Sequence, residues 1–159
     1  MKFNVDAFQL FDHEWALLTA GNSDSFNTMT ISWGGLGTMW GKPVATVYVR
    51  PSRYTYQFME KNDYFTVSFY AESYRKALSL LGTLSGRDCN KVSEAGLTPI
   101  PTEGSMTFHE ARVTLLCKKI YRQDMDLSAM PKDVVEEYYN GNSVHTMYIG
   151  EVIKIIESK

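Results

Sequence analysis

Apolar and polar residues alternate strictly along residues 28–33, and this period of two predicts a β-strand. One face of the strand carries only hydroxyl side chains and the other only large apolar ones: Thr28, Thr30 and Ser32 against Met29, Ile31 and Trp33. The apolar face is expected to pack against the core. The hydroxyl face must then meet either water or a polar ligand.

Alternation or β-branched composition predicts further strands along the chain, at residues 14–20, 44–50, 64–70, 108–122 and 145–156. Ser52 and Ser73 each precede a run with helical spacing, so each is interpreted as a helix N-cap. Pro131 suits the first turn of a short helix that runs to residue 139.

Two segments lack such a pattern and are expected to be loops. The first, residues 34–43, is rich in glycine and ends at Pro43, which suits the start of the next strand. The second, residues 83–104, is polar and punctuated by glycine and proline, with one short helical turn near residues 91–95. A loop of this length in a compact domain suggests a binding role or a mobile flap.

This succession of strands, with two or three short helices between them, predicts a β-rich α+β fold. Long strands in a small chain favour a barrel closed on itself, because closure removes exposed sheet edges. The chain has 159 residues and shows no internal repeat, low-complexity segment or linker, so residues 1–159 are expected to form a single domain.

Composition argues against several classes of function. A formal net charge of −2 offers no general affinity for nucleic acid, because it would not neutralise a phosphate backbone. No apolar run approaches the roughly 20 residues of a membrane helix, and the first residues show no signal peptide. Cys89 and Cys117 are isolated, so no disulfide framework is indicated. We therefore expect a soluble, cytoplasmic protein.

The strongest candidate for chemistry is an anion site at residues 50–55. Arg50 ends a predicted strand and Ser52 begins a predicted helix, whose free backbone N–H groups and positive dipole end favour a phosphate. Arg53 supplies a second guanidinium for charge-assisted hydrogen bonds, and Thr55 a hydroxyl. A capped helix with solvated arginines fits the same residues, and the pattern alone does not separate the two interpretations.

The glycines of the first loop do not form a dinucleotide-binding fingerprint. A Gly-x-Gly-x-x-Gly match from Gly35 would require glycine at the position of Trp40, and the loop precedes a strand rather than a helix. These glycines indicate backbone that turns tightly or approaches a ligand. Trp33 and Trp40 flank them and are candidates for stacking on a flat ring, although burial in a core is the commoner role of tryptophan.

The three histidines, His13, His109 and His145, show no metal-ligand spacing, so no metal site is predicted. The chain has no Gly-x-Ser-x-Gly motif of a serine hydrolase. Cys117 lies among apolar residues and is interpreted as a core residue rather than a nucleophile. His145 is the one histidine that we single out as a candidate catalytic residue; a surface or capping role also explains it.

Three stretches of the chain are distinctive when taken together. The first is Asn-Thr-Met-Thr-Ile-Ser-Trp-Gly-Gly-Leu-Gly at residues 27–37, followed by Lys-Pro at 42–43 and Val-Tyr-Val-Arg-Pro-Ser-Arg-Tyr-Thr at 47–55. The second is Ser-Gly-Arg-Asp at 85–88 with Lys91 and Ala-Gly-Leu-Thr-Pro at 95–99; the third is His-Thr-Met-Tyr-Ile-Gly-Glu-Val at 145–152. In this order they resemble the flavin reductase-like, or flavoredoxin, family of FMN-binding split-barrel proteins.

The resemblance implies a Greek-key split β-barrel that forms a homodimer and binds FMN non-covalently near the subunit interface. The residues implied to face the flavin are Thr30, Ser32 and Trp33, and those implied to hold its phosphate are Arg50, Ser52, Arg53 and Thr55. The loop implied to close on the cofactor carries Ser85, Arg87 and Lys91. His145 is implied to lie near the isoalloxazine or the nicotinamide.

Three functions are compatible with this interpretation. The first is an oxidoreductase in which NADH or NADPH reduces bound FMN by hydride transfer and electrons pass to an acceptor. The second is an FMN-binding electron carrier reduced by a redox protein partner, which the lack of a nicotinamide-nucleotide motif keeps open. The third is a small-molecule binding module without redox turnover. The lack of obvious acid–base residues is no objection to the first two, because the cofactor carries the redox chemistry.

Overall fold

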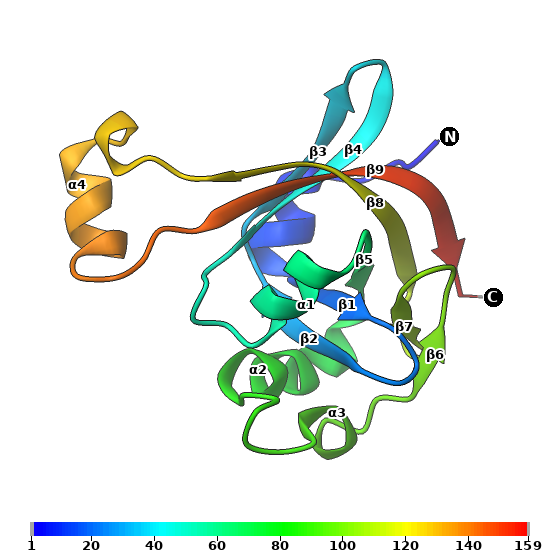
Figure 1. Ribbon diagram of the computed structural model, residues 1–159. Coiled ribbons are helices and arrows are strands. Elements are labelled where there is room, and N and C mark those ends of the chain that lie inside the picture. Colours follow the sequence, from blue (N-terminus) through cyan, green and yellow to red (C-terminus); the bar gives the residue numbers. More distant parts are fainter. Residues whose placement is uncertain (1, 159) are drawn as a thin grey trace.

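The computed structural model describes residues 2–158, and strands dominate it (Figure 1). The strands of the main sheet are β1 (Ala16–Gly21), β2 (Phe26–Ile31), β3 (Gly34–Met39), β4 (Lys42–Val49), β5 (Tyr64–Phe69), β8 (Val113–Asp124) and β9 (Thr146–Glu157). They pair in the order β2-β1-β5-β8-β9-β4-β3, always antiparallel. A second sheet pairs β6 (Pro99–Pro101) with β7 (Met106–Phe108). The predicted β-rich α+β fold is confirmed.

Short helices fill the connections between the strands. They are η1 (Gln9–His13), α1 (Thr55–Lys61), η2 (Glu72–Tyr74), α2 (Arg75–Thr83), α3 (Lys91–Glu94), η3 (Leu127–Ala129), α4 (Lys132–Val134) and η4 (Val135–Tyr139). The helices expected after residues 52, 73 and 131 therefore exist, and the short helical turn near residues 91–95 is confirmed as α3.

Neither serine caps a helix as the sequence predicts. Ser52 lies in a turn that is closed by the Arg53 amide, which donates to the carbonyl of Arg50 at 3.0 Å, so α1 begins only at Thr55. Ser73 lies inside the 3₁₀ turn η2, and α2 follows that turn. In both cases an additional turn precedes the helix and takes up the serine, which a pattern of helical spacing does not reveal.

The glycine-rich segment is a strand, so the loop expected at residues 34–43 is wrong. β3 pairs with β4 from Gly34 opposite Val47 to Met39 opposite Lys42. Trp40 and Gly41 form the turn between them, with φ of 54° and 71°. Two consecutive residues with positive φ give a hairpin turn whose twist matches the flanking strands. Strands pair through backbone N–H and C=O groups, which glycine also has. Because glycine has no side chain, the alternation of apolar and polar residues cannot reveal this strand.

The strand expected at residues 108–122 is divided. Its first residue belongs to β7, which pairs with β6, and a turn separates β7 from β8. The expected loop at residues 83–104 likewise contains α3 and β6. The remaining predicted strands agree with the structure to within two or three residues at their ends.

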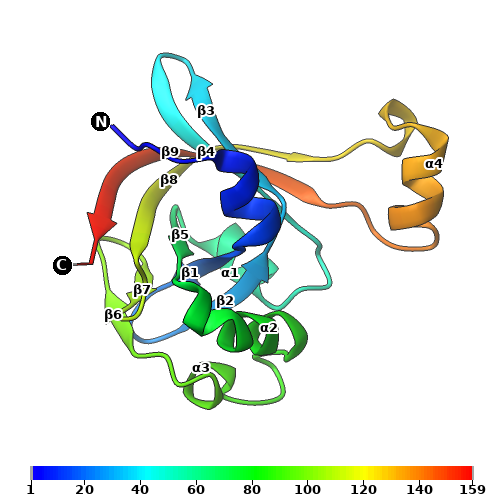
Figure 2. The same cartoon turned by 180° about the vertical axis from the view of Figure 1, so that it is seen from behind.

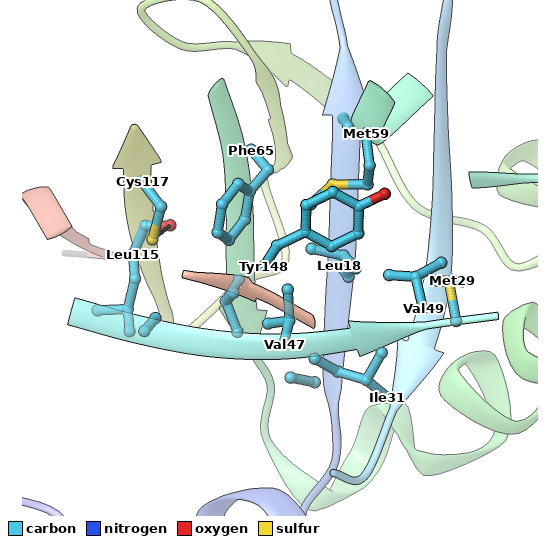
Figure 3. Close-up of a cluster of buried hydrophobic side chains, with 14 of the residues drawn as sticks. Leu18, Met29, Ile31, Val47, Val49, Met59, Phe65, Leu115, Cys117 and Tyr148 are labelled. Carbon is cyan, nitrogen blue, oxygen red and sulfur yellow. Dashed lines mark hydrogen bonds between the residues drawn. The ribbon is translucent and has the colours of Figure 1, made fainter. Parts of the chain in front are cut away.

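The main sheet curls around a single core, so strands at opposite ends of the pairing order share one cluster. Figure 3 shows Ile31 of β2 close to Val47 of β4. Phe65 of β5 and Tyr148 of β9 are almost completely buried there. Packing is tight at β9, because a Cβ at Gly150 would lie 2.5 Å from the Phe65 ring. This closure around a shared core is the barrel that the sequence predicts.

A second, smaller cluster lies on the other side of β1, where α2 packs against β2. Leu17 of β1 meets Leu78 and Leu81 of α2 there, and all three are buried. Both faces of β1 are therefore covered. None of the helices between residues 2 and 158 combines the length and apolar character that crossing a lipid bilayer requires.

Residues 125–145 form an arm that projects from the barrel and carries η3, α4 and η4. Figures 1 and 2 show this arm extending away from the rest of the chain, on the continuation of β8 and β9. The two strands pair as far as Asp124 opposite Thr146, immediately before the arm begins. The arm therefore leaves the body of the protein at the end of the longest ladder in the main sheet.

Candidate functional site

Two cavities meet between the barrel, the arm and the N-terminal turn η1. The arginine cavity has a volume of about 190 Å³, and its polar or aromatic lining consists of Thr30, Ser32, Trp33, Tyr48, Arg50, Arg53 and His145. The aromatic cavity has a volume of about 500 Å³ and is lined by Ala7, Phe8, Phe11, Asp12, Ser32, Trp33, Gly34, Tyr48, Met125 and Tyr139. Three residues, Ser32, Trp33 and Tyr48, line both cavities.

The hydroxyls of β2 mostly face protein rather than water or a ligand. Thr28 is fully buried and its Oγ1 lies 2.8 Å from the Oγ1 of Thr19. Thr30 donates to the carbonyl of Leu78 in α2, although it also borders the arginine cavity. Only Ser32, just beyond the end of β2, lines both cavities. The expectation that the hydroxyl face meets water or a polar ligand is therefore wrong for Thr28, whereas Thr30 and Ser32 both line the arginine cavity.

Trp33 is a surface residue of the site rather than a core residue. Its side chain remains 43% exposed, and its ring centroid lies 5.3 Å from those of both Tyr138 and His145. Trp40, the other candidate for stacking, stands 64% exposed at the tip of the β3–β4 hairpin and lines neither cavity. Of the two tryptophans, Trp33 is the one that a flat ring in these cavities would contact.

Arg53 points its charge into the arginine cavity without a carboxylate beside it. No ion pair or side-chain hydrogen bond involves Arg53 within residues 2–158. Burial lowers the pKa of its guanidinium below the ordinary value. The side chain is half-buried, and an unpaired guanidinium in this position is suited to an anion that enters from solvent.

Lys91 adds a second positive charge close to Arg53. Its side chain is only 3% exposed, and its Nζ donates to the carbonyls of Leu81 at 2.9 Å and Leu84 at 3.0 Å. Burial, and then the repulsion from Arg53, lower the pKa of Lys91 to about 8. No carboxylate pairs with Lys91 in the part of the chain that the structure describes. Together the two cations form an uncompensated positive cluster.

The segment 85–91 lies against the start of α1. Arg87 donates to the carbonyl of Ser52 at 3.2 Å, and its guanidinium lies 4.9 Å from the Tyr54 ring centroid. The Arg87 amide is held by the Ser85 hydroxyl at 3.2 Å. At Gly86 a Cβ would lie 2.2 Å from the Asn27 Oδ1, so a larger residue here would require the Asn27 side chain to shift.

Arg50 is directed away from Arg53 and toward the arm. Its guanidinium donates to the carbonyl of Tyr138 at 2.6 Å and to that of Ser143 at 2.8 Å. It also lies 5.0 Å from the centroid of the Tyr139 ring. Although Arg50 lines the arginine cavity, these contacts engage one N–H of each terminal nitrogen and fix the arm to the end of β4.

His145 is buried at the base of the arm, so the surface role considered for it is wrong. It is 8% exposed and lines the arginine cavity, and its Nδ1 lies 2.8 Å from the hydroxyl of Tyr139. Burial and then the positive charge of Arg50 lower its pKa to about 4. The imidazole is therefore neutral at neutral pH. In this form one ring nitrogen donates a hydrogen bond and the other accepts one.

The sequence-predicted residues thus separate into groups. The arginine cavity brings together Thr30, Ser32, Trp33, Arg50, Arg53 and His145. Lys91 lines a separate cavity of about 500 Å³ with Asn27, Gly86 and Arg87, although the charge of Arg53 reaches it. Ser52 is exposed next to Arg87. Thr55 is fully buried and accepts from the Asn27 side chain at 2.8 Å, which leaves it facing protein.

The description of residues 2–158 contains no group of three or more acidic, histidine or cysteine side chains placed to hold a metal ion.

Sequence inspection missed Tyr139, Tyr48 and the apolar residues of η1. Tyr139 lies only six positions before His145, but a turn separates them and no local pattern predicts their contact. Phe8 and Phe11 belong to the N-terminal turn, which has no strand or helix signal. Tyr48 was assigned to a strand, and its alternation with Val47 and Val49 could have placed it on the face opposite the core.

A family model described as "Flavin reductase like domain" matches residues 8–159 of the chain. No sequence among curated proteins matches it significantly. A solved flavoredoxin from Methanosarcina acetivorans has 19% identity and a TM-score of 0.74, covering 100% of this chain and 75% of its own. The flavoredoxin of Desulfovibrio vulgaris (Miyazaki F) has 24% identity and a TM-score of 0.73, with 100% and 78% covered.

A third solved structure is an FMN-binding protein from Thermus thermophilus with bound p-hydroxybenzaldehyde. It has 18% identity and a TM-score of 0.71, covering 94% of this chain and 76% of its own. At such identities the likeness to these three structures shows a shared fold.

Proposed function

Because the chain belongs to the family of the flavin reductase like domain, matched over residues 8–159, we propose that it is an FMN-binding oxidoreductase. The family resemblance seen in the sequence and the split-barrel fold that it implies are confirmed. FMN as the cofactor, NADH or NADPH as the reductant and a homodimer as the assembly are our proposals for this chain. A cytoplasmic location stays a prediction.

The observation that carries the proposal is the uncompensated pair of Arg53 and Lys91. Burial, and then the charge of Arg53, lower the pKa of Lys91, so a buried and a half-buried cation lie near each other without a carboxylate. The phosphate of FMN would neutralise both and accept charge-assisted hydrogen bonds from Arg53. Since α1 has only seven residues and Ser52 does not cap it, we assign the phosphate to these side chains rather than to the helix end.

The two cavities fit the rest of the cofactor. The arginine cavity alone, at about 190 Å³, is smaller than the roughly 300–1,000 Å³ of small-molecule sites, whereas the aromatic cavity beside it has about 500 Å³. Their lining changes from polar near Arg53 to aromatic near Phe11. A molecule with an anionic tail and a flat ring matches this succession, with Ser32 and Trp33 at the junction.

When bound, FMN would supply the redox chemistry, accepting electrons from a reductant and releasing them to an acceptor. The protein residues have other tasks. Arg53 and Lys91 bind the phosphate, Trp33 offers a stacking surface, and the buried Phe11 supplies an apolar wall. His145 offers a neutral hydrogen-bonding group at the cavity.

A homodimer is supported by apolar side chains that remain exposed around the site. Phe8 is 88% exposed, and Tyr138 on the arm is 39% exposed. Both lie close to the aromatic cavity, Phe8 in its wall and Tyr138 against Trp33. A second copy that covers these rings would bury them and enclose the cavity.

An electron carrier without nicotinamide activity is the second candidate, and one observation favours it. The residues that line the aromatic cavity include a single charged side chain, Asp12, and no cation. The pyrophosphate of NADH or NADPH therefore finds no positive partner there. A redox protein that delivers electrons through contact would not need one.

The test begins with titration of the purified protein with FMN, followed by absorbance and by protein fluorescence. We expect a saturable complex, and absence of any binding would reject the proposal. Steady-state oxidation of NADH and NADPH by the FMN complex then separates the two candidates. Turnover supports the reductase, whereas FMN binding without turnover supports the carrier.

A further inference from the structure

The hydrogen bond between Tyr139 and His145 determines how the histidine faces the cavity. The Tyr139 hydroxyl lies 2.8 Å from Nδ1, and both side chains are buried, at 6% and 8% exposure. Nε2 makes no hydrogen bond to any group of residues 2–158, and His145 lines the arginine cavity. One ring nitrogen is therefore occupied within the protein, and the other is available to a ligand.

The direction of this hydrogen bond follows from the partners of the phenol. Besides Nδ1, the one hydrogen-bond partner of the Tyr139 hydroxyl among residues 2–158 is the Met125 Sδ, at 4.0 Å. A thioether is a weak acceptor, whereas an imidazole nitrogen is a good one. The hydroxyl therefore donates to Nδ1. A neutral imidazole carries one proton, so that proton must sit on Nε2.

Arg50 holds Tyr139 in this position. It donates to the backbone carbonyls of Tyr138 and Ser143, which lie on either side of the turn before His145, and it lies beside the Tyr139 ring. The end of β4 thus fixes both the phenol and the imidazole.

The charged and titratable groups around His145 oppose its protonation. Arg50 and Arg53 face it from the end of β4 and the following turn, and Tyr48 from β4 itself. From η4, the Tyr139 ring packs directly against His145. The Tyr138 ring packs against Trp33, which in turn packs against His145. The Asp124 carboxylate at the start of the arm accepts from the Thr146 hydroxyl at 2.6 Å, and no Asp or Glu of the described residues lines the arginine cavity.

We propose that Tyr139 is a positioning residue that sets the tautomer of His145, so that Nε2–H points into the cavity as a hydrogen-bond donor. The ligand atom that it takes is an acceptor, such as a carbonyl oxygen or an unprotonated ring nitrogen of the flavin or of its reaction partner. The nature of that ligand rests on the proposed function, but the tautomer does not. His145 then orients a ring by donation and does not supply a proton to it.

The decisive measurement is ¹⁵N–¹H nuclear magnetic resonance of the full chain without added flavin. The signals of His145 are identified by their loss in His145→Gln, since the chain has three histidines. We expect the Nε2–H tautomer between about pH 5.5 and 8. An Nδ1–H tautomer, or an imidazolium across that range, would overturn the proposal directly in the wild type.

Tyr139→Phe tests the cause, and Tyr138→Phe is the matched control. Tyr138 is the adjacent residue and contacts Trp33, but it makes no hydrogen bond to His145. Tyr139→Phe should give a mixture of tautomers and a higher pKa for His145, while Tyr138→Phe should leave both as in the wild type. Equal behaviour of the two variants would remove Tyr139 from the role proposed here.

Ligand binding provides the second readout. Loss of one oriented donor should weaken FMN and riboflavin by about the same factor, in the range of roughly three- to tenfold, in Tyr139→Phe. If Tyr139→Phe binds both ligands as tightly as Tyr138→Phe does, Nε2–H does not donate to the bound ring. If the wild type binds no FMN at all, the proposed function fails, while the tautomer measurement still decides the role of Tyr139.

Discussion

The two arginines of the same turn show opposite behaviour at the two ends of one cavity. Arg50 has its donors on two carbonyls of the arm and its guanidinium beside Tyr139. Arg53, three positions later, has no hydrogen-bond acceptor or carboxylate among residues 2–158, and the buried Lys91 lies near it. The two residues are only three positions apart, and they differ in the segments that pack against them: the arm contacts Arg50 and does not hydrogen-bond to Arg53.

The comparison separates the task of organising a site from that of binding a ligand. Arg50, which is held by two carbonyls of the arm and packs on the Tyr139 ring, fixes how the arm meets the end of β4. A cation that the protein leaves uncompensated near a cavity stabilises an incoming anion instead. The Arg50 end is therefore the organised end, and the Arg53 end is the one suited to phosphate.

The largest expected effect comes from removing the uncompensated charge. Arg53→Ala should weaken FMN by about tenfold or more, because charge-assisted hydrogen bonds to the phosphate are lost. Riboflavin, which lacks the phosphate, should bind nearly as before. Calorimetric titration of both ligands measures the difference, and equal losses for FMN and riboflavin would remove Arg53 from the phosphate site.

The second prediction concerns the pH dependence of stability. Burial and the charge of Arg53 lower the pKa of Lys91 to about 8 in the folded protein, below its value of about 10.4 in an unfolded chain. Between these values the unfolded chain binds more protons, so the free energy of unfolding without flavin should rise with pH from about 8 to about 10. The contribution of Lys91 is at most about 1.4 kcal/mol per pH unit.

Lys91→Met should remove this part of the rise, because methionine carries no charge to bury. Urea unfolding at several pH values measures it, and Lys76→Met, which changes an exposed lysine of α2, is the control. A wild-type curve parallel to that of Lys91→Met would show that Lys91 is not held in an unfavourable charged state.

A smaller effect, without selectivity for the phosphate, is expected from the organised end. Arg50→Met releases the Tyr138 and Ser143 carbonyls, so it should weaken FMN and riboflavin alike, by about three- to fivefold. Amide hydrogen exchange in residues 125–145 should become faster in the same variant. If the loss falls on FMN alone, Arg50 is a phosphate ligand after all, and the contrast between the two arginines disappears.

The smallest effect tests how closely the segment 85–91 must approach β2. In Gly86→Ala the new methyl group would meet the Asn27 side chain, which can shift, so FMN affinity should fall by only about two- to threefold. Gly37→Ala is the matched control, because no heavy atom lies within 4 Å of its added Cβ. Identical titrations for the two variants would show that this approach does not affect the site.

The sequence predicts what depends on short-range patterning. Strict alternation at residues 28–33 indicates a strand, and the strand exists as β2. The same pattern cannot tell that α2 would cover its hydroxyl face and accept a hydrogen bond from Thr30, because that contact joins residues 48 positions apart. The strand β3 was missed since glycine carries no side chain to form a pattern.

The candidate site was predicted as a set of residues but not as an arrangement. Sequence pattern and resemblance select Arg50, Arg53, Lys91 and His145; the structure places the first two and His145 around one cavity and Lys91 in the wall of another. Which arginine would meet the arm depends on how β8 and β9 extend to carry it, and this is a property of strand pairing over the whole sheet. The contact between Tyr139 and His145 depends on the same pairing.

The two end strands of the main sheet, β2 and β3, are consecutive in the chain, with only Ser32 and Trp33 between them. The pairing of β1 with β2 stops at Ile31, and that of β3 with β4 starts at Gly34. These two residues therefore span the open seam of the barrel, where their peptide groups belong to neither ladder. A heterocycle with its own donors and acceptors can complete the hydrogen bonding at this seam, as a further strand would elsewhere.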